Sequence, residues 1–202
     1  MKETVKTHKA LIGHMLERVK NCIETSPVKI INGYRYIINP LIDGVSSMDP
    51  RTLKEITDEM ERIGDFDCDV ILAPEAMGIP FGTLISEHTG IPMSIVRKKS
   101  YGLPGELEIA VTTGYSTSRQ YINGVTKGTR VVIVDDVVST GGTLRALVDG
   151  LRAVGAEIVD VVIVMDKSDD LRVIEKEMDL TIKTVVRVEW DGDRPVAVEP
   201  MR

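Results

Sequence analysis

A run of acidic, hydroxyl and glycine residues lies in the second half of the chain. It follows the apolar segment Val131–Val134 and comprises Asp135, Asp136, Val137, Val138, Ser139, Thr140, Gly141, Gly142 and Thr143. The apolar segment predicts a buried strand that ends at the two carboxylates, and a helix should follow the glycines. Helix amino termini expose unpaired N–H groups, and glycines let the backbone approach a phosphate closely. We therefore predict that residues 139–143 bind a 5′-phosphate.

Two adjacent carboxylates beside a phosphate site imply a ligand that also offers hydroxyl groups or a cationic centre. A ribose 5-phosphate meets both conditions, because Asp135 and Asp136 can accept hydrogen bonds from its 2′ and 3′ hydroxyls. An Asp-Asp pair alone is more typical of a solvated strand end, so the prediction depends on the residues that follow. The chain has neither the Gly-Lys-Ser/Thr of a Walker A loop here nor a GxGxxG fingerprint.

Three consecutive cations, Arg97, Lys98 and Lys99, stand out in a chain whose net charge is −6. They follow the apolar segment Met93–Val96, and parallel strands place their carboxyl ends at one edge of a sheet. Cations there can stabilise a leaving group of several negative charges, such as pyrophosphate, although a solvated basic turn has the same composition. The glycines that follow, in residues 102–105, predict a mobile loop that covers the reacting sugar and excludes water.

The elements that must position these residues alternate between strand and helix. Mainly apolar segments, typical of strands buried on both faces, occupy residues 70–73, 93–96, 131–134 and 158–165, although Asp160 interrupts the last. Helical spacing occupies residues 51–63, 79–89, 142–154 and 168–178. This alternation predicts an α/β fold with a mainly parallel twisted sheet and helices on both faces.

The two ends of the chain have other patterns. The predicted elements before residue 51 are a helix over residues 4–25, a hairpin of strands 28–31 and 34–38, and a loop over 39–50. Two further strands are predicted after residue 181. We expect a single domain over residues 1–202, in which residues 1–50 form an N-terminal helix and a small hood, and residues 51–202 form the α/β core.

Composition and charge exclude several classes of protein. With 43% hydrophobic and 28% charged residues the chain is not disordered, and its negative charge argues against a nucleic-acid partner. No apolar run approaches the roughly 18 residues of a membrane span, so no membrane partner is expected. The two cysteines form no CxxC motif, and we expect a cytoplasmic, reducing setting.

The segment from Val131 to Thr143 resembles the phosphoribosyl-pyrophosphate signature of type I phosphoribosyltransferases, and the resemblance extends over residues 69–198. Taken as a whole, the chain is most similar to the archaeal hypoxanthine/guanine subfamily, which has motifs like those of adenine enzymes. The resemblance implies the type I phosphoribosyltransferase fold. It also implies transfer of phosphoribosyl from phosphoribosyl pyrophosphate (PRPP) to a purine, with Mg²⁺ bound through the substrate rather than by protein ligands, and a homodimer.

Further site residues are implied by the same resemblance. The pyrophosphate loop matches Glu75, Ala76, Met77 and Gly78, and the cations Arg97, Lys98 and Lys99 are assigned to the same anion. The flexible lid matches Tyr101, Gly105, Glu106 and Tyr115. The chain departs from related enzymes at Met77, where adenine enzymes commonly have Arg. It also departs at Gly114 and Ser139, where related enzymes have an acid. Glu106 and Glu108 are nearby candidates for the proton-transfer group, and neither can be assigned to it.

Lys167 follows the apolar segment that ends at Met165 and resembles a lysine of bacterial xanthine phosphoribosyltransferases that contacts the purine 6-oxygen. A lysine only donates hydrogen bonds, so it favours a carbonyl at C6 and disfavours the amino group of adenine. We predict a 6-oxopurine substrate, hypoxanthine or guanine, giving IMP or GMP. A surface lysine that ends a strand, an adenine enzyme, an orotate enzyme and a non-catalytic PRPP-sensing regulator are the alternatives.

Overall fold

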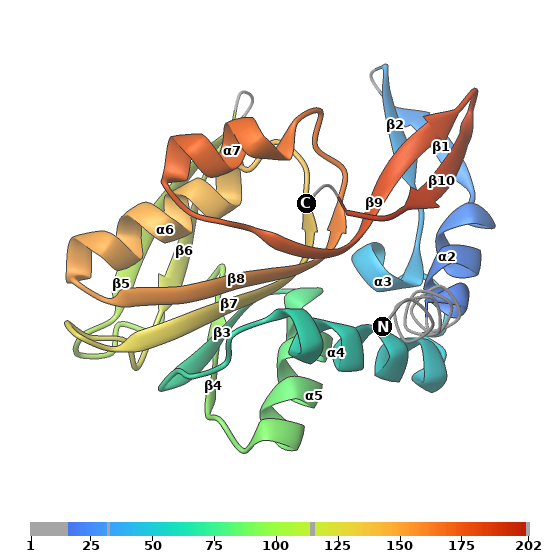
Figure 1. Ribbon diagram of the computed structural model, residues 1–202. Coiled ribbons are helices and arrows are strands. Elements are labelled where there is room, and N and C mark those ends of the chain that lie inside the picture. Colours follow the sequence, from blue (N-terminus) through green and yellow to red (C-terminus); the bar gives the residue numbers. More distant parts are fainter. Residues whose placement is uncertain (1–15, 32, 114–115, 201–202) are drawn as a thin grey trace.

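The computed structural model describes residues 16–31, 33–113 and 116–200. Its centre is a six-stranded sheet in the order β10-β9-β8-β7-β3-β4 (Figure 1). The strands are β3 (Val70–Pro74), β4 (Met93–Val96), β7 (Arg130–Val138), β8 (Glu157–Asp166), β9 (Lys183–Asp191) and β10 (Arg194–Val198). All neighbouring pairs are parallel except β9 and β10, which are antiparallel. The predicted α/β fold with a mainly parallel sheet is therefore confirmed.

Helices cover both faces of this sheet. The helices α4 (Pro50–Ile63) and α5 (Gly78–Thr89) lie on one face, and α6 (Gly142–Val154) and α7 (Leu171–Met178) lie on the other (Figure 1). Alternate residues of β7 point to opposite faces: Val131 and Ile133 join the core beneath α6 and α7, whereas Val132 and Val134 join the core beneath α4 and α5. The central strands are apolar throughout because both of their faces are buried.

The predicted end of the strand at the acidic pair is wrong. The strand β7 continues through Asp135 and Asp136 to Val138, because β8 extends equally far and pairs with it up to Val138 and Asp166. The acidic residues therefore have extended backbone, and consecutive side chains along such a strand point to opposite faces of the sheet.

The hood begins with α2 (Glu17–Glu24), and residues 4–15 of the predicted first helix lie outside the described residues. The strands β1 (Val28–Ile31) and β2 (Tyr34–Ile37) form the predicted hairpin. The predicted loop over 39–50 is partly wrong, since it contains the short helix α3 (Pro40–Asp43). The buried side chain of Asn39 starts this helix by accepting a hydrogen bond from Leu41 N at 2.8 Å. A single turn is too short to give a periodic sequence signal.

Arg35 of the hairpin β1–β2 contacts the hairpin β9–β10. Arg35 Nη1 donates to Gly192 O at 2.8 Å, and the Arg35 guanidinium lies 5.1 Å from the centre of the Trp190 ring. Trp190 is half-buried and packs on the core beneath α4 and α5. Two segments more than 150 residues apart therefore form one structure at the end of the sheet (Figure 1).

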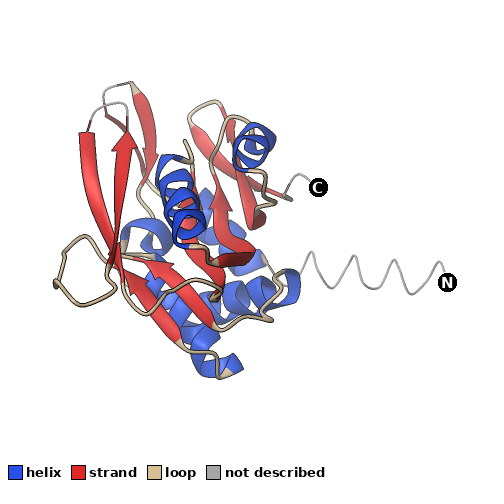
Figure 2. Cartoon of the chain, turned by 90° about the vertical axis from the view of Figure 1, so that its left-hand side faces the viewer, coloured by secondary structure: helices blue, strands red, loops and turns tan. Residues whose placement is uncertain are grey.

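Two further strands, β5 (Leu107–Thr113) and β6 (Ser116–Ile122), form an antiparallel hairpin, which we call the lid hairpin (Figure 2). Ile109 and Ile122 are buried in the core with α6, and a Cβ added to Gly150 would lie 2.7 Å from Ile109 Cγ1. The base of the hairpin is therefore fixed to the sheet through α6.

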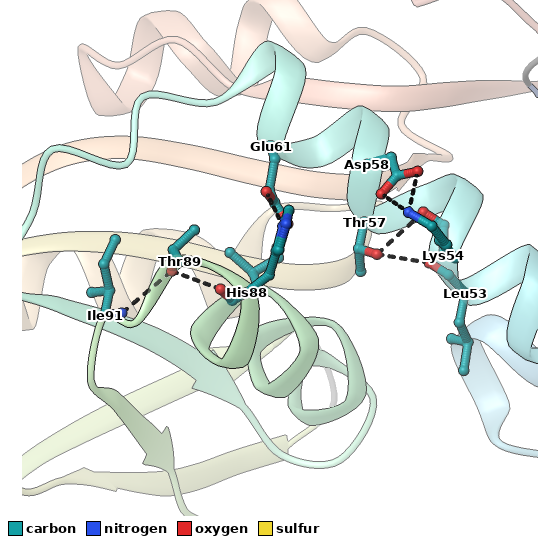
Figure 3. A network of polar contacts seen from close by, with 9 residues as sticks. Leu53, Lys54, Thr57, Asp58, Glu61, His88, Thr89 and Ile91 are labelled. Atoms are coloured by element: carbon teal, nitrogen blue, oxygen red, sulfur yellow. Dashed lines mark hydrogen bonds and ion pairs between the residues drawn. The ribbon is translucent and has the colours of Figure 1, made fainter.

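On the other face of the sheet, polar side chains join α4 to α5 (Figure 3). His88 Nδ1 lies 2.7 Å from Glu61 Oε2, and its imidazole is exposed, as expected for a surface histidine. Among the helices that the structure describes, none has the length and apolar character needed to cross a bilayer.

Candidate active site

The predicted site residues within the described part of the chain follow or end four neighbouring parallel strands. The pyrophosphate loop, Glu75–Gly78, follows β3, and the cations 97–99 follow β4. The acidic pair lies near the end of β7 and is followed by residues 139–143, which we call the phosphate loop after their predicted role. Lys167 follows β8. The carboxyl ends of parallel strands meet at one edge, where open α/β sheets bind ligands. The fold thus brings these residues to one edge.

The two carboxylates of β7 are packed into this edge. Asp136 is buried, Asp135 is half-buried, and Asp135 Oδ1 accepts a hydrogen bond from Asp136 N at 2.9 Å. Burial raises the pKa of both carboxyls, and the negative charge of Asp136 raises the pKa of Asp135 further. In the absence of a ligand, burial therefore disfavours the charged form of the two carboxyls. Cationic or hydroxyl groups of a ligand can offset that free-energy cost.

Asp135 also faces the pyrophosphate loop. A Cβ added to Gly78, at the start of α5, would lie 2.9 Å from Asp135 Oδ1 and 2.9 Å from Val134 O. Only a glycine allows this close approach between α5 and β7. The peptide bond between Glu75 and Ala76 in this loop is cis. Met77, in the same loop, faces the hood, since a Cβ added to Gly44 would lie 3.1 Å from Met77 Sδ.

The phosphate loop ends in a helix with free N–H groups. Gly141 has a φ of 74° and precedes the first residue of α6, Gly142, with no side-chain cap on the helix. Arg145 Nη1 donates to Thr140 O at 2.6 Å, and the same guanidinium forms an ion pair with Glu177 of α7. The helix start is thus open to an anion, while α7 holds the loop from outside.

Of the three predicted cations, only Arg97 is partly buried. Its Nε lies 2.8 Å from Glu75 Oε2, an ion pair whose N–H does not have hydrogen-bond geometry. The backbone of Arg97 exchanges two hydrogen bonds with Tyr121 of β6, at 2.8 and 2.7 Å. Lys98 and Lys99 are exposed. Arg97 therefore joins the pyrophosphate loop to the lid hairpin, and the two lysines add positive charge at the surface.

The segment 98–106, which we call the lid loop, is organised around one carboxylate. Glu106 accepts hydrogen bonds from Tyr101 N at 3.0 Å, Gly102 N at 3.1 Å, Asn123 Nδ2 at 3.0 Å and the Ser100 hydroxyl. These bonds, that from the Ser100 hydroxyl being the largest cause, lower the pKa of Glu106 to about 2. A carboxyl with this pKa is a weak acid–base catalyst near neutral pH, so the geometry favours a structural role over proton transfer.

The remaining lid residues are exposed or lie outside the described residues. Tyr101 is exposed beside Arg97 and Lys99, and Gly105 has a φ of 81° in open space. Tyr115 and Gly114 lie outside the described residues. Glu108 pairs with Arg119 at 2.9 Å across the lid hairpin.

Lys167 lies in a short turn whose backbone is bonded to β7. Its N–H donates to Val138 O at 2.8 Å, directly before the phosphate loop. The residue is half-buried. The predicted base-binding lysine and the predicted phosphate loop therefore follow the paired ends of two neighbouring strands, β8 and β7.

Several residues of this edge carried no recognised signal in the sequence. Arg145, Asn123 and Arg187 belong to no motif, and only their partners in space reveal them. Asp166 was visible as a charge at the end of an apolar segment, which is the one sequence signal that could have been used.

A cavity of about 650 Å³ lies at the opposite, amino edge of β8 and β9. It includes Asp160 and Lys183, which pair with each other at 2.6 Å, and none of the predicted site residues lines it. Within the described part of the chain, no group of three or more His, Cys, Asp or Glu side chains is placed to hold a metal ion.

Comparison with known proteins identifies the family of this chain. The family model described as "Phosphoribosyl transferase domain" matches residues 51–193. A hypoxanthine/guanine phosphoribosyltransferase of Methanothrix soehngenii is 44% identical over 92% of this chain and 98% of its own length. A protein of the same name from Methanosarcina acetivorans is 54% identical over 76% of this chain and 81% of its own.

Solved structures agree on the fold. The adenine phosphoribosyltransferase of Rhodothermus marinus matches with a TM-score of 0.67 over 87% of this chain and 99% of that one, at 22% identity. That of Saccharomyces cerevisiae matches with a TM-score of 0.65 at 21% identity. At such identity the likeness concerns the fold. The sheet edge, the matching family model and the relatives agree: the chain belongs to the type I phosphoribosyltransferase family, as its sequence predicted.

Proposed function

We propose that this chain transfers the phosphoribosyl group of PRPP to hypoxanthine or guanine, giving IMP or GMP and pyrophosphate. The observation that carries the proposal is the shared sheet edge, where anion-binding loops, an acidic pair and a donor-only lysine follow or end four neighbouring strands. The names of the archaeal relatives support the choice of base.

Residues 139–143 would bind the 5′-phosphate through the N–H groups at the start of α6 and the hydroxyls of Ser139, Thr140 and Thr143. Asp135 and Asp136 would accept hydrogen bonds from the ribose hydroxyls. As the bond from C1′ to pyrophosphate breaks, its electron pair leaves with the pyrophosphate and positive charge develops on the sugar. The two carboxylates would stabilise this positively charged sugar more strongly than the neutral sugar ring of bound PRPP.

The leaving pyrophosphate would be held by the backbone of Glu75, Ala76, Met77 and Gly78 and by the cations 97–99. Glu75 pairs with Arg97 at 2.8 Å, and an arriving polyanion would compete for that guanidinium. Met77 supplies no charge, so the backbone N–H groups and the cluster after β4 would carry the stabilisation. The lid loop and lid hairpin would close over the sugar and keep water from it.

A nitrogen of the purine would form the new bond to C1′ and lose its proton, which the departing pyrophosphate can accept. Lys167 would donate a hydrogen bond to the 6-oxygen of the base. An adenine in the same position would place its amino hydrogens against the ammonium group. A site built for a hydrogen bond discriminates strongly against a ligand that cannot make it.

We also propose that Mg²⁺ takes part, bound through the oxygens of the substrate rather than by protein ligands, because this ion prefers oxygen ligands and keeps several of its waters. When bound it would neutralise charge on the pyrophosphate. The homodimer expected from the resemblance remains part of the proposal.

Product formation from PRPP and Mg²⁺ tests the proposal, with hypoxanthine, guanine, xanthine, adenine and orotate offered separately. We expect nucleotide from hypoxanthine and guanine. Turnover of adenine alone would overturn the choice of base. Tight PRPP binding without turnover of any base would overturn the enzymatic reading in favour of a PRPP sensor.

A further inference from the structure

A buried ion pair precedes the predicted base-binding lysine. Asp166 ends β8 and is fully buried, and its Oδ2 accepts a hydrogen bond from Arg187 Nη1 of β9 at 2.6 Å. Only 12% of the Arg187 side chain is exposed. The two residues are direct neighbours in the register of β8 and β9. Burying two charges is costly, so such a pair contributes specificity of structure more readily than stability.

The second carboxylate oxygen of Asp166 shapes the turn that carries Lys167. Asp166 Oδ1 accepts hydrogen bonds from Ser168 N at 2.8 Å and from Ser168 Oγ at 2.6 Å. The bond from Lys167 N to Val138 O ties the same turn to β7. Asp166, Lys167 and Ser168, which we call the base turn, are therefore held from β7 on one side and from β9 on the other.

Arg187 connects this turn to the hood end of the sheet. It lies opposite Asp166 in β8 and opposite Val198 in β10, and β9 continues from it to Trp190, which lies beneath Arg35 of the hood. The exposed Glu189 is the other carboxylate beside Arg187, 3.6 Å from its Nε, and contributes no bond to the base turn.

We infer that Arg187 is a positioning residue for base recognition: through Asp166 it fixes the base turn, and so directs Lys167 toward the 6-oxygen of the purine. This inference rests on the proposed function for the role of Lys167. Without the guanidinium, the buried carboxylate would lose its compensating charge and turn toward water, and its two bonds to Ser168 would be lost.

The R187M variant tests the inference, since methionine keeps an unbranched apolar stem. We expect its KM for hypoxanthine and guanine to rise at least tenfold, its KM for PRPP to stay within about twofold, and its preference over adenine to fall. R187K, which keeps the charge, should recover part of the loss. S168A, which removes one bond of the turn, should raise the KM for the base about threefold. E189Q is the matched control and should behave as the wild type.

Equal increases of both KM values in R187M, or an unchanged KM for the base in a folded R187M, would overturn the inference. Amide exchange gives a readout that does not need turnover. The N–H of Ser168 should exchange at least tenfold faster in R187M than in E189Q. If the wild type uses no 6-oxopurine, the proposed function fails. In that case faster exchange in R187M still supports a turn held by Arg187, and unchanged exchange overturns it.

Discussion

The side chain of Asn123 donates a hydrogen bond to Glu106 at 3.0 Å, and this bond joins the end of the lid loop to the residue that follows the lid hairpin. Glu106 also accepts two backbone N–H groups and a hydroxyl from the loop itself. The carboxylate of Glu106 thus joins the lid loop to the base of the lid hairpin. The sequence alone places Glu106 among the candidates for proton transfer, whereas its contacts give it a structural role.

Replacing Glu106 by Gln tests this role. The amide would present an NH₂ group to donors that now face a carboxylate oxygen, so the lid loop should lose its fixed shape. We expect E106Q to lower kcat/KM for PRPP about tenfold and to leave the thermal midpoint nearly unchanged. Steady-state kinetics and a thermal melt measure both. E108Q is the control, because Glu108 pairs only with Arg119 in the described contacts. Equal kinetics of the two variants would contradict the prediction.

The acidic pair of β7 should cost the ligand-free protein stability. Burial raises the pKa of Asp135 and Asp136, so the folded state binds protons more tightly than the unfolded chain. The stabilisation from protonation is fully present below the unfolded pKa of 3.8 and is lost as the pH rises through the raised folded pKa. The folded protein therefore loses this stabilisation relative to the unfolded chain as the pH rises from 3.8 toward neutrality.

We expect D135N to raise the free energy of unfolding at pH 7 by about 1–2 kcal/mol, and this gain to shrink toward pH 4. Turnover should fall at least a hundredfold, because the variant loses a charge that the proposed transition state needs. Urea unfolding between pH 4 and pH 8 measures the first effect. D149N, at an exposed position of α6, is the control. A loss of stability in D135N at pH 7 would contradict the prediction.

Gly141 should tolerate no side chain, for two separable reasons. Its φ of 74° disfavours any other residue, and an added Cβ would lie 2.8 Å from Ile174 Cγ2 of α7. Gly128 has a similar φ of 82°, but no atom lies within 4 Å of an added Cβ. A substitution at Gly128 therefore measures the cost of the backbone conformation alone. We expect G128A to cost about 1 kcal/mol and G141A about 2–4 kcal/mol, with a raised KM for PRPP in G141A alone. Equal costs in the two variants would refute the role of α7 in supporting the phosphate loop.

Lys167 should decide the base. We expect K167M to lower kcat/KM for hypoxanthine and guanine by a factor of about 10² and to leave the KM for PRPP unchanged. Competition assays with adenine measure the change in preference. K176M, at an exposed position of α7, is the control. Intact turnover of both 6-oxopurines in K167M would show that another group selects the base.

The sequence by itself determined the sheet and the helices that cover it. Apolar segments predicted β3, β4, β7 and β8, because strands buried on both faces must be apolar throughout. The residue types and order from Asp135 to Thr143 predicted a glycine turn followed by a helix start, although the strand does not end at the acids but continues to Val138. The resemblance of residues 131–143 to a known signature then pointed to the family, which the family model confirms.

Tertiary structure alone decided how far β7 extends, which carboxylate closes the lid and what holds Lys167. The acidic residues of β7 stay in the strand because β8 pairs with them, and a pairing partner leaves no trace in a strand's own sequence. Glu106 meets Asn123 across 17 residues, and Asp166 meets Arg187 across 21. Such contacts depend on how separate elements pack, whereas hydrophobic periodicity records only which face of each element is buried.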